Sequence, residues 1–181
     1  MSANFSFRKY SNPVFIETGT FKGEGVRRAI SAGFKKIYSI ELSEKLYRGA
    51  SAKFNKEIKS GQVVLFNGDS TKLLPVILEK IEVRVTFWLD AHFCFGETAR
   101  GDVDVPLLKE LDSIARHPIR THTILIDDVR LFGTKRDNSD WSEIMLSEVI
   151  AKIKQINSGY LIHYERGAVA NDVLVAEIPY I

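Results

Sequence analysis

The chain has little of what stabilises secreted proteins or anchors proteins in membranes. Its one cysteine, Cys94, cannot form a disulfide within the chain, which agrees with a reducing compartment. No apolar run approaches the roughly 18–20 residues that span a bilayer. Residues 1–10 also lack the apolar core of a signal peptide. We therefore expect a cytoplasmic protein without a membrane partner.

An excess of charge of one sign is also missing. Lys and Arg total 25 against 23 for Asp and Glu, and no basic run stands out, so nucleic-acid binding is not indicated. Glycine, proline and low-complexity sequence are not enriched, and 181 residues with 45% apolar content can bury one core. We expect a single domain over residues 1–181, without linker or repeat.

Short apolar runs alternate with amphipathic stretches, which is the pattern of a parallel sheet covered by helices. Ser43 and Ser70 are expected as N-caps and Gly33 as a C-cap. Two late strands flank a short turn and predict a C-terminal antiparallel hairpin. The fold class is therefore α/β, with a doubly wound, mostly parallel sheet of seven strands. The predicted strands span 14–18, 36–41, 63–67, 84–90, 123–127, 160–165 and 172–178, and the predicted helices 23–32, 43–58, 71–79, 105–116 and 142–156.

A glycine-rich turn follows the first predicted strand. Gly19 and Gly23 lack a Cβ and tolerate positive φ, so backbone N–H groups and a helix N-terminus can approach a ligand there. Glu41 ends the next strand roughly 20 residues on, the spacing of a ribose-binding carboxylate. The glycine spacing does not match the G-x-G-x-x-G motif of nicotinamide-binding proteins. Together, the turn and the acid predict a cofactor site.

Acids also end the later strands. Asp69 lies in a Gly-Asp-Ser turn, Asp90 and His92 follow the fourth strand, and Asp127-Asp128 follow the fifth. In an open doubly wound sheet, ligands bind outside the carboxyl ends of the strands. One such acid is readily a helix cap or a loop acid, but their succession favours a site.

With these motifs, nearly the whole chain resembles the class I S-adenosylmethionine-dependent methyltransferases, whose first motif is an acid followed by spaced glycines. The resemblance implies a Rossmann-like fold and S-adenosylmethionine as cofactor. It implies that Glu17 and Gly19 lie beside the methionyl part, that Glu41 binds both ribose hydroxyls, and that Asp69 and Ser70 lie at the adenine. The implied cofactor-binding residues are Glu17, Thr18, Gly19, Thr20, Gly23, Glu41, Asp69 and Ser70.

The ends of the fourth and fifth strands resemble those of the metal-dependent small-molecule O-methyltransferases, including the catechol and macrolide-modifying types. By that resemblance the metal ligands are Asp90, Asp127 and Asp128. Mg²⁺ prefers such hard oxygen ligands, and a bound cation lowers the pKa of a coordinated hydroxyl. The implied activity is methyl transfer to a hydroxyl of a small molecule or sugar, assisted by the metal.

Alternatives remain open for several of these residues. Asp127 and Asp128 repel one another unless a cation is near, and Arg130 could be that cation instead of a metal. The pair could also cap a helix or brace a loop. His92 points to the same side as Asp90; the two are the expected catalytic residues, with His92 as general base, extra ligand or a hydrogen-bonded structural histidine. His117, His122 and His163 are expected to be structural, and Trp88 to lie in the core.

Loops 93–104 and 131–140 are expected to shape the acceptor pocket. Only about a dozen residues precede the first strand, whereas the metal-dependent enzymes carry N-terminal helices over the substrate. Either the loops close the site, a second subunit of a homodimer covers it, or a large acceptor stays exposed. Two rival functions are a cofactor-binding module with little or no activity and a metal-dependent hydrolase using Asp90, His92, Asp127 and Asp128.

Overall fold

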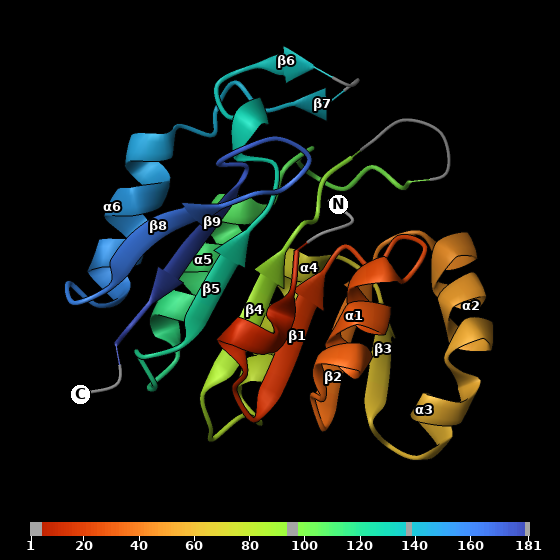
Figure 1. The fold of residues 1–181 in the computed structure, drawn as a ribbon. Helices are drawn as coiled ribbons and strands as arrows, with labels where there is room; N and C mark the ends of the chain where they lie inside the picture. Colours follow the sequence, from red (N-terminus) through yellow and green to blue (C-terminus); the bar gives the residue numbers. More distant parts are fainter. Residues whose placement is uncertain (1–4, 94–97, 137–138, 180–181) are drawn as a thin grey trace.

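The structure, a computed structural model, describes residues 5–93, 98–136 and 139–179. These residues form a seven-stranded sheet between two layers of helices (Figure 1). The strand order is β3-β2-β1-β4-β5-β9-β8, and only β9 runs antiparallel to its neighbours β5 and β8. The strands of this sheet are β1 (Val14–Thr18), β2 (Lys36–Glu41), β3 (Val63–Asn67), β4 (Val85–Leu89), β5 (Thr123–Ile126), β8 (Leu161–Glu165) and β9 (Val173–Glu177).

The central strands are hydrophobic because both of their faces are covered. Every residue of β1, β4 and β5 is buried, as expected for parallel strands between two helical layers. The predicted Rossmann-like, doubly wound sheet with a C-terminal antiparallel hairpin is confirmed. The helices are α1 (Glu24–Ala32), α2 (Glu44–Lys53), α3 (Asn55–Lys59), α4 (Ser70–Leu78), α5 (Leu107–Arg116) and α6 (Leu146–Ile156), with short 3₁₀ turns η1 (Phe7–Tyr10) and η2 (Val129–Leu131).

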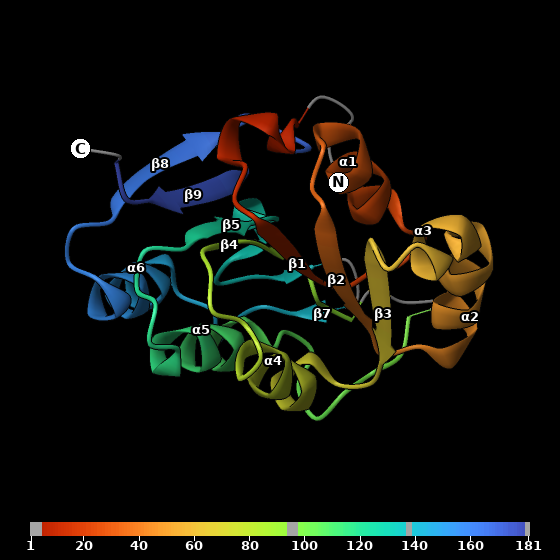
Figure 2. The same ribbon diagram turned by 90° about the horizontal axis from the view of Figure 1, so that it is seen from below.

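Figure 2 shows the two layers: α4, α5 and α6 cover one face of the sheet, and α1, α2, α3 and the N-terminal segment cover the other. In that segment, the rings of Phe5 and Phe7 lie 5.2 and 5.0 Å from Trp88. Trp88 is fully buried, as predicted. The aromatic cover itself was not predicted, because the segment lacks helical periodicity.

Helix ends show where local sequence and packing disagree. Ser43 and Gly33 cap α2 and α1 as predicted. Ser70, predicted as an N-cap, is instead the first residue of α4, and the capping carboxylate is Asp69. The predicted helix 43–58 is divided into α2 and α3 at Phe54, whose ring packs where a side chain on Gly23 would lie. The break between α2 and α3 therefore coincides with packing of the Phe54 ring against the start of α1. The apolar periodicity of the sequence did not indicate this break.

One feature lies outside the sequence predictions. Within loop 131–140, β6 (Lys135–Arg136) and β7 (Ser139–Asp140) form a small antiparallel hairpin. In the described part of the chain, no helix is both long enough and apolar enough to cross a bilayer.

Candidate functional site

A cavity of about 350 Å³ opens at the carboxyl ends of the parallel strands. Its walls come from the turn after β1, the end of β2, the turn before α4 and the segments that follow β4 and β5. This is the edge at which open doubly wound sheets bind ligands. Of the predicted site residues, the wall contains Gly19, Thr20, Glu41, Asp69, Ser70, Asp90, His92 and Asp128.

The turn after β1 brings backbone close to the end of β4. Gly19 has a φ of 85°, and a Cβ there would lie 2.7 Å from the carbonyl oxygen of Asp90. Only glycine accommodates both the positive φ and this close approach. Thr20 is fixed by a 2.5 Å hydrogen bond between its Oγ1 and the Oγ of Ser39. The turn therefore presents backbone to the cavity at the topological switch point between β1 and β4.

Glu41, the last residue of β2, places its carboxylate in the cavity wall. Its Oε2 accepts a hydrogen bond from the backbone N–H of Phe21 at 2.7 Å, and its Oε1 accepts one from Ser43 at 2.8 Å. Burial raises the pKa of Glu41, while backbone hydrogen bonds from Ser43, Phe21 and Leu42 act in the opposite direction. A carboxylate has about four lone-pair sites, so acceptor capacity remains for a ligand hydroxyl.

The turn before α4 contributes Asp69 and Ser70. Asp69 Oδ1 accepts hydrogen bonds from Thr71 N and Thr71 Oγ1, both at 2.8 Å. Ser70 Oγ donates to Glu110 Oε1 at 2.5 Å. Glu110 was missed by the sequence analysis, although an acid within the apolar face of a predicted helix signals a buried carboxyl. Burial raises the pKa of Glu110 to about 7.

Glu17, Thr18 and Gly23 are not among the residues that line the cavity. Glu17 lies fully buried within β1, where Oε2 accepts a 2.5 Å hydrogen bond from Ser39 Oγ. Burial raises the pKa of Glu17 to about 8. Gly23 has a φ of 77°, and a Cβ there would lie 2.4 Å from the Phe54 ring. These three residues therefore support the turn from behind rather than form the cavity wall.

The three aspartates predicted as metal ligands are divided between two groups. Asp90 and Asp128 meet at His92, whose Nδ1 lies 3.9 Å from Asp90 Oδ1 and 3.7 Å from Asp128 Oδ2. Asp127 groups instead with Asp128 and Asp172, and it is absent from the main cavity wall. Its Oδ1 accepts the backbone N–H of Asp128 at 3.0 Å.

Burial sets the protonation of this cluster. It raises the pKa of Asp90, an effect that Asp127 and Asp128 reinforce. It also lowers the pKa of His92, although the nearby Asp128 acts in the opposite direction. The His92 imidazole is therefore neutral near pH 7, and its buried Nδ1 has no hydrogen-bond partner in the described part of the chain.

Arg130 supplies the cation that the sequence allowed as an alternative to a metal. Its Nη1 donates to Asp128 Oδ1 and, at 2.6 Å, to Asp172 Oδ2. Asp172 is fully buried in the turn between β8 and β9. The sequence analysis missed it because its partner lies 42 positions away in the chain.

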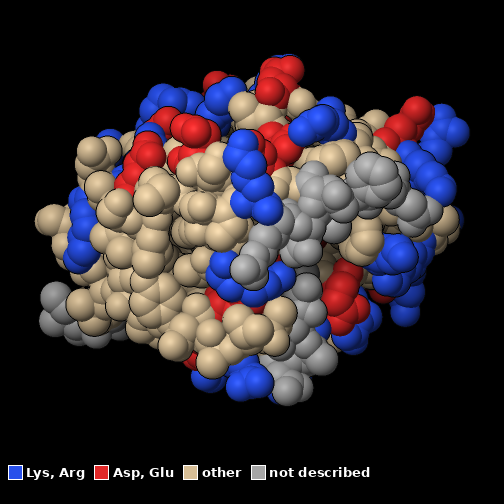
Figure 3. All heavy atoms as spheres, turned by 90° about the horizontal axis from the view of Figure 1, so that it is seen from above, with Lys and Arg blue, Asp and Glu red and all other residues tan. Residues whose placement is uncertain are grey.

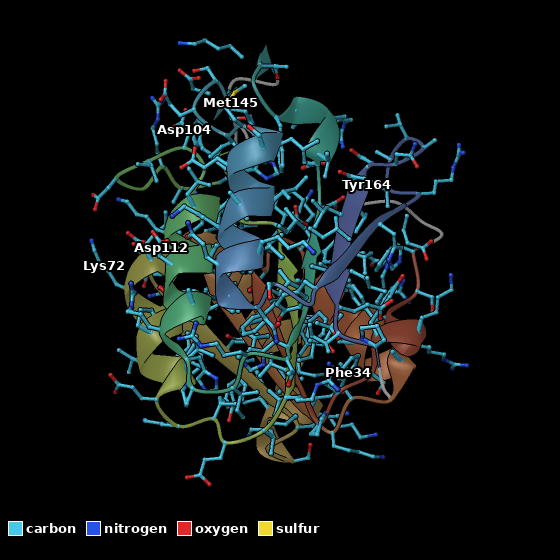
Figure 4. All side chains as sticks on the ribbon, turned by 90° about the vertical axis from the view of Figure 1, so that its left-hand side faces the viewer. Phe34, Lys72, Asp104, Asp112, Met145 and Tyr164 are labelled. Carbon is cyan, nitrogen blue, oxygen red and sulfur yellow. The ribbon has the colours of Figure 1, made fainter. Side chains whose placement is uncertain are left out.

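Residues 98, 99 and 101–104 of the loop after β4 form part of the cavity wall. Arg100 holds Asp104 through bonds of 2.7 and 2.9 Å, and Asp104 Oδ2 accepts the backbone N–H of Asp140 at 3.1 Å. Across the mouth, Lys72 lies 3.4 Å from Asp102. Figure 4 shows Asp104 at one end of the molecule and Lys72 projecting from α4. Loop 93–104 thus contributes to the pocket as predicted; its residues 94–97, including Cys94, lie outside the described residues.

Charges of both signs are interspersed on this end of the molecule (Figure 3). Four basic residues near the cavity take part in ion pairs with neighbouring carboxylates. The pairs are Lys72 with Asp69 and Asp102, Arg100 with Asp104, Arg130 with Asp128 and Asp172, and Lys135 with Asp140.

Solved structures share this architecture. The O-methyltransferase TomG from Streptomyces achromogenes, involved in tomaymycin synthesis and solved with S-adenosylmethionine, matches with a TM-score of 0.59 and 14% identity over 96% of this chain and 76% of its own. An O-methyltransferase from Bacillus cereus, solved with S-adenosylhomocysteine, matches with a TM-score of 0.62 and 12% identity over 96% and 77% of the two chains. A putative rRNA methylase from Clostridium thermocellum matches with a TM-score of 0.61 and 10% identity over 94% and 92%.

These likenesses show the fold. The chain has the Rossmann-like fold of the class I S-adenosylmethionine-dependent methyltransferases, as its motifs predicted. No protein-family model matches the sequence, and the search of curated proteins finds no match. The activity is therefore argued from the site itself.

Proposed function

We propose that this protein is an S-adenosylmethionine-dependent methyltransferase acting on a hydroxyl of a small molecule or sugar. The observation that carries the proposal is the carboxylate of Glu41. It ends β2 in the wall of the cavity, and two backbone N–H groups orient it. A bidentate acceptor in that position is suited to the two hydroxyls of a ribose.

The residues of the cavity fit the rest of the cofactor. The backbone at Gly19 and Thr20 faces the place of the methionyl part, and a Cβ at Gly19 would obstruct this approach. Asp69 and Ser70 border the opposite end, where they would meet the adenine. When bound, S-adenosylmethionine supplies an electrophilic methyl group whose bond to sulfur breaks as the bond to the acceptor oxygen forms.

His92 is the group in the cavity wall suited to accept the hydroxyl proton. Its pKa is lowered by burial, so the imidazole is neutral, and its Nδ1 lies between Asp90 and Asp128. Because the buried Nδ1 is directed at these carboxylates, the hydroxyl proton would be taken up at Nε2, and the resulting imidazolium would be stabilised by a neighbouring carboxylate. The hydroxyl oxygen would thereby gain nucleophilic character as the methyl group is transferred.

The acceptor we propose is small. Residues 98, 99 and 101–104 border the cavity, and Lys72, Arg100 and Arg130 near it are paired with carboxylates, which argues against a nucleic-acid backbone as the acceptor. The loop supplies part of the cavity wall from within the chain, so this proposal does not require the homodimer. The hydrolase alternative needs Asp127 at the reacting centre, and the cavity wall does not contain it.

Calorimetric titration with S-adenosylmethionine, with and without Mg²⁺, tests the cofactor. We expect saturable binding under both conditions. A screen of phenols, catechols and sugars for S-adenosylhomocysteine release then tests the transfer. Binding without turnover across the panel would favour a cofactor-binding module, and absence of binding would end the methyltransferase proposal.

Replacing His92 tests its role as proton acceptor. We expect His92→Gln to lower kcat about 10²–10⁴-fold, with little change in S-adenosylmethionine affinity, because the side chain meets the acceptor rather than the ribose or adenine. Initial rates and calorimetry measure the two quantities. His163→Gln, at a half-exposed position on β8, is the matched control. A kcat for His92→Gln equal to that of the control would rule out this role.

A further inference from the structure

The turn between β8 and β9 is built around the carboxylate of Asp172. Its Oδ2 accepts backbone N–H bonds from Ala168 at 2.9 Å and Val169 at 3.4 Å, and its Oδ1 accepts one from Arg130 at 3.3 Å. A Cβ on Gly167 would lie 2.7 Å from Asp172 Cβ, so the turn closes tightly around the acid. Asp172 is therefore a fixed, fully buried negative charge that requires a cationic partner.

Arg130 is that partner, and it reaches the cavity as well. Asp128 has a φ of 62° and is the N-cap residue of η2, and the Arg130 side chain folds back from η2 onto the Asp128 carboxylate. The same Nη1 donates to Asp172 at 2.6 Å. The side chain of Asp128 is only 9% exposed, whereas that of Arg130 is 33% exposed and forms part of the cavity wall. The guanidinium of Arg130 thus binds two buried carboxylates, those of Asp128 and Asp172, at the wall of the cavity.

In this arrangement, hydrogen bonds within the protein occupy carboxylate oxygens that a divalent cation would need as ligands. Asp128 Oδ1 is taken by Arg130, and Asp127 Oδ1 by the N–H of Asp128. Asp127 Oδ2 has no hydrogen-bond partner in the described part of the chain, but Asp127 is not part of the main cavity wall, and its neighbours Asp128 and Asp172 are both bound by Arg130. The best remaining set, Asp90 Oδ1, His92 Nδ1 and Asp128 Oδ2, shares Asp128 with the guanidinium. A divalent ion there would be repelled by a fixed positive charge at close range, so the residues present do not fit the metal site implied by the resemblance.

We infer that Arg130, held in position by Asp172, takes the place of the divalent cation in this cavity. Methyl transfer is then metal-independent. Asp172 is a positioning residue: it lies behind the wall and acts through Arg130. This inference rests on the proposed function for its catalytic meaning, whereas exclusion of a cation is a property of the unliganded protein.

Binding of Mn²⁺ to the chelator-treated full chain, followed by the loss of the paramagnetic signal of free Mn²⁺, tests the inference directly. We expect Arg130→Met to bind one Mn²⁺ at least tenfold more tightly than wild type, a difference of about 1.4 kcal/mol. Adding Asp128→Asn to Arg130→Met should remove the gain. Arg130→Lys keeps a positive charge and should exclude Mn²⁺ as wild type does. Arg48→Met, at an exposed position on α2, is the control.

Wild-type protein that binds one Mn²⁺ per chain, weakened by Asp128→Asn and not tightened by Arg130→Met, would overturn the inference. Absence of Mn²⁺ binding by folded Arg130→Met would also overturn it, because the guanidinium would then exclude nothing. Thermal unfolding of each variant establishes that it is folded. The S-adenosylmethionine titration is separate: its failure would remove the proposed function, and the Mn²⁺ result would stand or fall independently.

Discussion

Glu41→Ala is expected to weaken S-adenosylmethionine binding by more than about 100-fold. Each hydrogen bond to a charged group contributes about 1.5–3 kcal/mol, so loss of two ribose contacts amounts to roughly 3 kcal/mol or more. The carboxylate also accepts the N–H groups of Phe21 and Ser43, so its removal loosens the turn after β1. Calorimetric titration of both proteins gives the two dissociation constants.

Two variants separate cofactor contact from bracing of the turn. Glu44→Ala removes an exposed acid at the start of α2, three residues away, and should bind as wild type does. Glu41→Gln retains one oxygen acceptor and should bind with intermediate affinity. Thermal unfolding tests whether Glu41→Ala is folded. A folded Glu41→Ala protein with wild-type affinity would show that the carboxylate does not meet the cofactor.

The strands were predictable because their signal is local. Phe15, Ile16 and Phe87 are fully buried, and strands covered on both faces need continuous hydrophobic runs. The division between α2 and α3 was not predictable, since the break at Phe54 accompanies packing against Gly23, 31 positions earlier. Hydrophobic periodicity reports which face is buried but not where a ring from another element must fit.

In the candidate site, too, the residues that depend on local sequence were predictable and those that depend on tertiary structure were not. Glu41, Asp69 and Asp90 follow parallel strands, whose carboxyl ends meet at one edge, so sequence alone could bring them together. Neighbouring acids after β5 were not distinguishable, because the positive φ of Asp128 decides which carboxylate faces the cavity. Asp172 depends on how β9 pairs with β5, which no local pattern reports.

His117 and His122, expected to be structural, form a chain of hydrogen bonds at the opposite ends of β4 and β5. The N–H of Val85 donates to His122 Nδ1 at 3.1 Å, so the proton of His122 is on Nε2. That Nε2 lies 2.9 Å from His117 Nδ1, and His117 Nε2 lies 2.9 Å from the carbonyl oxygen of Ile81. His122 is therefore held in one tautomer, because a second proton on Nδ1 would face the N–H of Val85.

Acidification should therefore destabilise the fold through His122. Burial, with His117 and Arg84 in support, lowers its pKa from 6.5 to about 3. A depressed pKa in the folded state means that its contribution to stability is present above pH 6.5 and lost as pH falls toward 3. Between pH 6.5 and 4.5, two pH units, the loss is about 2–3 kcal/mol. Urea unfolding across this range measures it.

The comparison with His122→Asn isolates this contribution from other buried groups. Glu17 and Glu110 act with the opposite sign, since their raised pKa values favour folding below pH 4.5 and oppose it as pH rises through 7 to 8. Wild type and His122→Asn both contain Glu17 and Glu110, so the pH dependence due to these two residues cancels in the difference between their free energies of unfolding. We expect the stability gap between wild type and His122→Asn to narrow by about 2–3 kcal/mol on acidification to pH 4.5. A gap for His122→Asn that does not change with pH would mean that the buried pair accepts a proton without loss of stability, contrary to its hydrogen bonding.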